Sequence, residues 1–350
     1  MKNNKGAIEI QLNWVFVLII GAIIFVFFFS IVQKQRSIVE QESDFKITKE
    51  ISSIMNGALS SEKTLSIIDI NGIKFDVDCN GFGSDKNYFG LTPVFSPNFI
   101  EGKNMILWSR DFNMPFRAAN FLYLTSNQVR YILVYDDASE GFMNDIYNLF
   151  PEGINIEKIK LNELDDLTDK NNYKVKLVFF EVEPPLYLNQ FTNTPAKDVK
   201  TIKVVPFSES GLENDEIGTL SFSSDGDSYY ASKEALLGAI FAENKEEYEC
   251  AMKKAFKNLD LLSQIYTERA QLIIDEYVSG GYTDATECIN NLDLIKTRYL
   301  QNIQLKANAL TLSLTDAEDI KSIWSNSYMY SDSLSHYNNV LKIKSCPVIY

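Results

Sequence analysis

The amino-acid sequence predicts an α/β protein that is anchored by one N-terminal transmembrane helix. Three observations lead to this fold class: an apolar run without charge or proline at Trp14–Val32, strand patterns alternating with helical patterns across 61–231, and a helical pattern across 232–350. Alternating strands and helices favour a small, mainly parallel sheet. Short breaks between successive helices favour an antiparallel bundle. We therefore expect a transmembrane helix, a mainly parallel sheet domain that opens with a β-hairpin, and a C-terminal antiparallel helical bundle.

The run from Trp14 to Val32 is 19 residues long. At about 1.5 Å per residue it nearly crosses a bilayer core of about 30 Å. A buried core helix is the alternative interpretation, but it would need protein on every side. The residues after the run are apolar enough to build a core of their own, so we interpret the run as the membrane contact. Residues 1–13 then form a leader-like segment, and 33–60 form an amphipathic stalk helix.

Composition limits what the protein can bind. Hydrophobic residues make up 45% of the 350 residues, which is typical of a folded protein. The net charge of −14 would repel a nucleic-acid backbone, so no nucleic-acid partner is expected. His336 is the only histidine, which argues against a histidine-dependent triad or a multi-histidine zinc site. No cofactor is predicted.

In the α/β domain, an alternating stretch at 64–79 contains Asn71-Gly72 and predicts a β-hairpin, because Asn-Gly favours the type I′ turn. Further strands are expected at 105–108, 129–135, 154–159, 174–180 and 201–205, with a helix at 139–150. A second hairpin is expected between 217–222 and 228–231. The C-terminal bundle is expected to contain helices at 232–243, 246–278, 284–312 and 316–344.

Four cysteines, Cys79, Cys250, Cys288 and Cys346, all follow the apolar run, and none forms a C-x-x-C motif. An even number of widely spaced cysteines in a membrane-anchored body indicates two disulfides in an oxidising compartment. The alternative is four independent buried thiols in a cytosolic domain.

The expected helices decide how the cysteines pair. Cys250 lies near the start of a long helix that ends at a Gly-Gly turn, whereas Cys288 follows that turn by a few residues. The two would lie about 40 Å apart along the bundle, and a disulfide needs Cα atoms within about 7 Å. The last helix returns toward the end where Cys288 lies, and Cys346 follows it. We therefore predict a Cys288–Cys346 disulfide and, by elimination, a Cys79–Cys250 disulfide.

Two signals in the sequence predict opposite orientations of the body across the membrane. One is the distribution of charge around the apolar run, and the other is the presence of the cysteines. Two lysines precede the run, whereas Lys34, Arg36, Lys46 and Lys49 follow it, and this count favours a body inside the cell. The cysteines, and a large acidic body that could translocate as a unit, favour the outside. We take the second interpretation: a single-pass protein of the cell membrane with its soluble body outside the cytoplasm.

The N-terminus, Lys5-Gly6-Ala7-Ile8-Glu9 followed by a long apolar helix, resembles the class III signal of type IV pilins and archaeal pilin-like proteins. In that family a peptidase cuts after the glycine and leaves the helix as an anchor or as part of a filament core. The resemblance implies a cut between Gly6 and Ala7. It covers about 30 residues, and Gln11 stands where the family usually has glutamate. A plain uncleaved anchor is the alternative.

The candidate ligand site is the stretch YDDASEG at 135–141, between an expected buried strand and an expected helix. Asp137-x-Ser139-x-Gly141 is similar to the D-x-S-x-S metal motif of von Willebrand A domains, and this resemblance implies that Asp137 and Ser139 bind Mg²⁺. Gly141 replaces the second serine, and no downstream Thr and Asp complete the set. The alternative is a helix cap, in which Asp137 accepts from the first turn and Glu140 completes a capping box.

Two carboxylates, Asp136 and Glu181, each follow an expected parallel strand. At one sheet edge they could bind a metal or act as acid and base, or they are solvated strand ends. The sequence thus predicts a membrane-anchored extracytoplasmic structural or interaction protein, such as a type IV pilin-like subunit of a homo-oligomer or pilus-like assembly. A membrane-tethered α/β enzyme, or a metal-dependent binding module at Asp137, is the alternative.

Overall fold

The computed structural model describes residues 5–61, 63–70, 72–84, 87–90, 93–188, 190–209, 212–223, 225–282, 285–314 and 316–349, and side chains for most of them. The chain divides into two compact units, Met1–Ile51 and Ser52–Tyr350. The second unit, which we call the body, contains all the strands, and all the helices after the first, that the structure describes. The two domains predicted at 61–231 and 232–350 therefore belong to one compact unit.

The first helix, α1 (Lys5–Ser60), is uninterrupted over 56 residues. No proline occurs within it, so every turn can close its backbone hydrogen bonds. The predicted transmembrane and stalk helices are thus one helix, which begins at Lys5 and includes most of the segment predicted as a leader. At its end, Asn120 Nδ2 donates to the carbonyls of Ala58, at 3.1 Å, and Ser61, which satisfies acceptors that a helix end leaves free.

The main sheet has six strands in the order β10-β9-β11-β12-β13-β14. The first four, β9 (Val129–Tyr135), β10 (Ile156–Lys160), β11 (Lys174–Phe180) and β12 (Val199–Glu209), are mutually parallel. The last two, β13 (Leu212–Phe222) and β14 (Gly226–Ala231), are antiparallel and form the second predicted hairpin. The expected parallel sheet is therefore matched in part.

Two further sheets were not predicted. One has the order β1-β7-β8-β5 and comprises β1 (Lys63–Asp69), β5 (Val94–Phe95), β7 (Asn104–Asn113) and β8 (Arg117–Ser126). The other has the order β4-β3-β2-β6 and comprises β2 (Phe75–Asp78), β3 (Gly81–Ser84), β4 (Asn87–Gly90) and β6 (Phe99–Ile100).

The first predicted hairpin, at 64–79, is wrong. A turn is present, because the Ile73 N–H donates to the Ile70 carbonyl at 2.8 Å and Gly72 has a φ of 77°, whereas Asn71 lies outside the described residues. The strands on either side of the turn join different sheets: β1 pairs antiparallel with β7 over its whole length, and β2 pairs with β3 and β6. The partner of β1 thus comes from more than thirty residues further along the chain.

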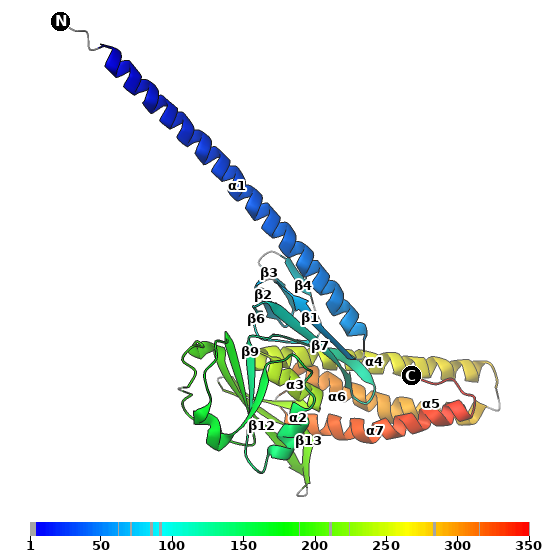
Figure 1. Ribbon diagram of the computed structural model, residues 1–350. Helices are drawn as coiled ribbons and strands as arrows, with labels where there is room; N and C mark the ends of the chain where they lie inside the picture. The colour runs from blue at the N-terminus through cyan, green and yellow to red at the C-terminus, as the bar shows by residue number, and fades with distance from the viewer. Residues whose placement is uncertain are drawn as a thin grey trace. The chain divides into compact units, whose positions relative to one another are not determined.

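Five α-helices of the body lie close to the predicted positions: α3 (Lys233–Phe241), α4 (Lys245–Ser279), α5 (Thr286–Leu294), α6 (Gln301–Leu312) and α7 (Ala317–Ile343). A π-helical turn, Ile295–Leu300, joins α5 to α6. Side chains cap three of these helices: Ser232 accepts from the Ala235 N–H, Asn244 from Glu247 and Asp316 from Glu318. In Figure 1, α4, α6 and α7 run alongside one another, as an antiparallel bundle requires.

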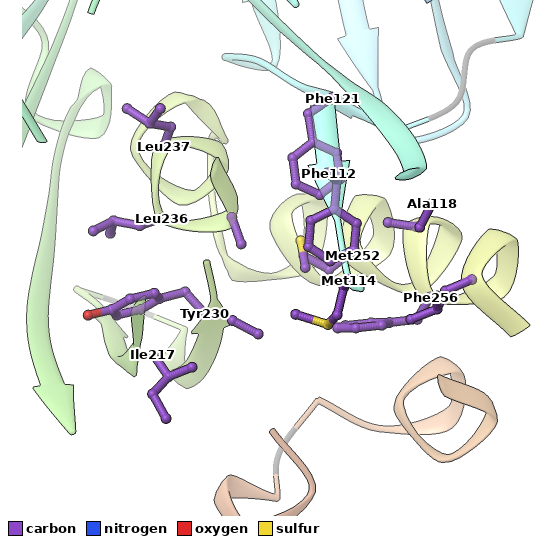
Figure 2. Packing of buried hydrophobic residues seen from close by; sticks show 14 of the residues in the cluster. Phe112, Met114, Ala118, Phe121, Ile217, Tyr230, Leu236, Leu237, Met252 and Phe256 are labelled. Atoms are coloured by element: carbon purple, nitrogen blue, oxygen red, sulfur yellow. The ribbon is translucent and has the colours of Figure 1, made fainter. Parts of the chain in front are cut away.

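The predicted bundle is nevertheless only partly matched, because α3 belongs to the interior of the body. Ala235 to Phe241 are all buried, and α3 contacts strands of two sheets, β8 and β14 among them. One apolar core joins these sheets to the helices (Figure 2). Within it, Phe112 and Phe121 stack with ring centres 4.7 Å apart, and Phe256 of α4 meets Phe112 edge-on at 6.0 Å.

The far face of the main sheet is covered by a second apolar cluster. Ile132 and Val134 of β9 and three residues of β11 pack there against Leu164, Val182 and Phe191. The covering segments are the 3₁₀ turn Leu161–Asp166 and the loop that follows β11. Burial on both faces explains why VRYILVY and KVKLVFF are nearly continuous apolar runs.

Candidate functional site

One helix of the described residues is long and apolar enough to cross a membrane. Its candidate span, Val17–Gln35, has 19 residues and a mean hydropathy of 2.4, and none of the window is buried. Side chains such as Phe25 and Val26 are 70% and 63% exposed. The predicted span Trp14–Val32 overlaps it, although the side chains of the first three of its residues are outside the described part. A continuous apolar surface of this kind marks contact with lipid or with another apolar surface.

The structure pairs Cys79 with Cys250 and Cys288 with Cys346, with Cα atoms 5.9 and 5.8 Å apart. These are the pairs that the helix lengths predict. The first disulfide joins the end of β2 to α4, and the second joins α5 to the segment after α7. Disulfides form and persist in oxidising compartments, so these two indicate an extracytoplasmic location for the body.

The predicted ligand site lies at the point where the strand order of the main sheet reverses. The chain passes from β9 to β10 on one side and then returns to β11 on the other side of β9. Asp136 follows β9 and Glu181 follows β11, and these neighbouring parallel strands end together, because Val134 is opposite Phe179. The expectation that both carboxylates end parallel strands is confirmed. This is the edge at which open α/β sheets bind ligands.

Asp136 is the residue that organises the turn after β9. Its Oδ1 accepts from the N–H groups of Ala138 and Ser139, at 3.1 and 2.9 Å, and from Ser139 Oγ at 2.9 Å. These hydrogen bonds hold the pKa of Asp136 below its usual value, and the one from the Ser139 N–H lowers it most. The proposed capping role of Asp137 is therefore wrong. Asp136 binds the turn, and α2 (Glu140–Tyr147) begins without a side-chain cap at Ser139.

Asp137 points to a different partner. Its carboxylate is 88% exposed and lies 2.6 Å from Lys160 Nζ of β10, which raises the pKa of Lys160 through that hydrogen bond. The pair borders a hollow of about 290 Å³, which Leu161 and Asn162 also line. Asp137 and Ser139 thus have separate partners, and among the described residues no three His, Cys, Asp or Glu side chains gather as metal ligands. The Mg²⁺ site remains a prediction.

Glu181 has a left-handed backbone, with a φ of 59°, which is uncommon for residues other than glycine. Its N–H donates to the Val204 carbonyl of β12 at 2.8 Å, so the strained residue terminates β11 while remaining joined to the sheet. Strained residues of this kind often mark functional positions. The C-terminal edge of β9 and β11 therefore remains the place where a ligand would be expected in the body.

A buried charge cluster was missed by the sequence analysis. Lys174 Nζ lies 2.7 Å from Glu243 Oε2 and 3.5 Å from Asp198, and all three residues are at most 9% exposed. Lys176 is also buried and donates to the Ala242 carbonyl, just after α3, at 2.8 Å. Burial is the main cause that lowers its pKa to about 8. The only signal in the sequence was a pair of lysines in the apolar strand KVKLVFF.

A lysine-lined hollow of about 720 Å³ lies beside the first disulfide. Lys245 and Lys253 stand 3.8 and 3.9 Å from Glu249, and Lys254 donates to the Cys79 carbonyl. Because carboxylates alternate with the lysines, this hollow does not select ligands of one charge.

Comparisons of the chain with protein-family models, with curated proteins and with solved structures found no match.

Proposed function

We propose that this chain is a membrane-anchored protein whose disulfide-bonded body works outside the cytoplasm as a structural or interaction subunit. One observation carries the proposal: the exposed apolar span Val17–Gln35 is part of an unbroken helix that ends inside a body whose four cysteines are all in disulfides. The span supplies attachment, and the disulfides indicate the compartment.

A retained anchor explains α1 better than a cleaved secretory signal does. Cleavage after the apolar run would fall inside a continuous helix, since the helix extends another 25 residues beyond Gln35. The far end of that helix is bonded to the body, where Met55 and Ala58 are buried and Asn120 donates to the Ala58 carbonyl. The helix therefore serves both as the anchor and as part of the folded body.

The pilin-like form of the proposal places the processing site before the span. A cut between Gly6 and Ala7, as the resemblance implies, would remove a short polar leader and leave the apolar helix intact. The helix would then hold the subunit in the membrane or pack with those of other subunits in a filament core. The long unbroken helix supports this form, and Gln11 in place of the usual glutamate is its departure.

The test uses cells that produce the full chain. Protease is added to intact cells, the membranes are then isolated, and the mass and N-terminal sequence of the retained fragment are measured. We expect the body to be digested and the membrane fragment to begin at Ala7. A body that stays protected until the cells are lysed would overturn the extracytoplasmic location.

Two glycine variants separate processing from anchoring. Gly6→Leu alters the predicted cleavage site. Gly21→Leu introduces the same side chain into the span, where a Cβ added to the glycine has open space around it. We expect Gly6→Leu to keep residues 1–6 and Gly21→Leu to be processed like the wild type. A wild-type protein that retains its first six residues would contradict the pilin-like form and leave a fixed anchor.

A further inference from the structure

Strand β1 leaves one edge of its sheet open. It is the terminal strand of the order β1-β7-β8-β5, is seven residues long, and pairs with β7 along its entire length. The other side of β1 therefore presents a row of backbone N–H and C=O groups that the sheet does not use. Edges of this length are natural templates for pairing with another strand.

The apolar face of the sheet continues onto β1 and is uncovered there. Leu65 lies opposite Trp108 and Ile67 opposite Ile106, and both partners belong to the buried core. Leu65 itself is 43% exposed and Ile67 56% exposed, although Ile67 Cδ1 lies near Gly153. The core face thus ends in two half-exposed aliphatic side chains at an open edge.

Three of the other edge strands in the described sheets carry features that discourage pairing. The edge strand β10 has lysines at two of its five positions, Lys158 and Lys160, and β5 and β6 have only two residues each. Lysines and short strands are the usual protection of edges. On β1 the charges lie only at the two ends, at Lys63 and Asp69, and both residues are exposed.

The sequence of β1, Lys-Thr-Leu-Ser-Ile-Ile-Asp, is complementary to itself when it is reversed about Ser66. In that register, Lys63 of one copy faces Asp69 of the other, and Leu65 faces Ile67, at both ends of the pair. We propose that β1 is a homodimer edge, on which a second copy of this chain adds its own β1 antiparallel and joins the two four-stranded sheets into one. The occupant is a second copy because this two-fold arrangement matches both end charges and the aliphatic pair at once.

The backbone geometry agrees with this register. In an antiparallel pair, alternate residues of a strand direct their hydrogen-bonding groups to the same side. Reversal about Ser66 matches odd-numbered residues with odd and even with even, so the outward groups of one copy meet those of the other. The same matching keeps Leu65 and Ile67 of both copies on one face. The contact is isologous, as closed homodimers require.

The pairing does not depend on the proposed anchor or on its processing, so its test can fail without them. The full chain is purified in detergent micelles, and a cysteine is introduced at Ser66→Cys. In the proposed dimer the two Cα atoms lie about 5 Å apart, within disulfide range. The matched control is Lys63→Cys, whose copies lie about 20 Å apart in the same dimer. We expect oxidation to crosslink the first variant and not the second.

Charge reversal gives a second measurement that does not rely on crosslinking. Lys63→Asp and Asp69→Lys each place like charges opposite one another at both ends, and both sites are exposed, so folding should be preserved. We expect each single variant to weaken dimerisation about tenfold by sedimentation, and the double variant to restore it. A monomer at all concentrations, or a dimer that is unaffected by the reversals and crosslinks equally at both cysteines, overturns the proposal.

Discussion

Lys176 is the residue whose protonation depends most plainly on the fold. Its ammonium group donates to the Ala242 carbonyl just after α3, and burial lowers its pKa from 10.5 to about 8. Between these pH values the folded protein releases the proton while the unfolded chain still holds it. The free energy of unfolding therefore rises with pH in this window, and below pH 8 the cost of burying the charge is present in full.

We expect Lys176→Met to remove this pH dependence. Relative to the variant, the wild type should gain about 3 kcal/mol of unfolding free energy as the pH rises through this window. Denaturant titrations of both proteins from pH 7 to the upper end of the window measure the difference. The change with pH is decisive, because methionine also leaves the Ala242 carbonyl without its donor. A difference that is constant across the window would contradict the assignment.

The neighbouring lysine provides the control for that experiment. Lys174 lies on the same strand but is paired with Glu243 at 2.7 Å. Lys174→Met leaves the Glu243 carboxylate buried, with the Lys200 ammonium 4.0 Å from its Oε1. We therefore expect this variant to lower the free energy of unfolding by about 3 kcal/mol at neutral pH, because a buried charge has lost its partner.

At the scale of elements, the two disulfides close separate loops and should act independently. Their cysteines are 171 and 58 residues apart in sequence, and the loops do not overlap. In the chain-entropy view each restricts the unfolded chain, and removing the second, with Cys288→Ser and Cys346→Ser together, should cost about 4 kcal/mol. Thermal unfolding measures this loss.

Hydrogen exchange identifies which element each disulfide holds. Loss of the second disulfide should raise exchange at 344–349, the segment that Cys346 joins to α5. The matched control, Cys79→Ser with Cys250→Ser, should cost about 5 kcal/mol but leave exchange in that segment as it is in the wild type. Equal exchange in both variants would mean that packing, and not the disulfide, holds the C-terminal segment.

At the scale of the whole molecule, the body should unfold in one step. The apolar core takes residues from the β1-β7-β8-β5 sheet, from the main sheet and from α3, α4, α6 and α7. Trp108 of β7 belongs to this core, and Trp324 of α7 packs against it, so the two report on different elements of the body. We expect the fluorescence transitions of the Trp108→Phe and Trp324→Phe variants to share one shape and one denaturant slope. An unfolding intermediate, or different denaturant slopes for the two variants, would indicate that the body consists of two domains divided near the predicted boundary at 231/232.

Several parts of the fold could be read from local patterns. The strands 129–135 and 174–180 were predicted at their observed bounds, because burial on both faces makes them continuous apolar runs. The second hairpin and the long helices were also found, since their turns and breaks are local signals. The stretch 135–141 lies between a buried strand and a helix, as predicted, but the hydrogen bonds of its turn were assigned to Asp137 when Asp136 makes them.

The sequence by itself determined the features that depend on neighbouring residues: the apolar span, the helical stalk that follows it, the parallel strands, and the cysteine pairs that follow from helix lengths. Only the tertiary structure decided which distant segments meet. Strand β1 pairs with β7 and not across its own turn, α3 is enclosed between sheets, and Lys174 finds Glu243 from 69 residues away. The physical reason is that a turn or a period reports local backbone preference, whereas pairing and burial are chosen by the free energy of the whole core.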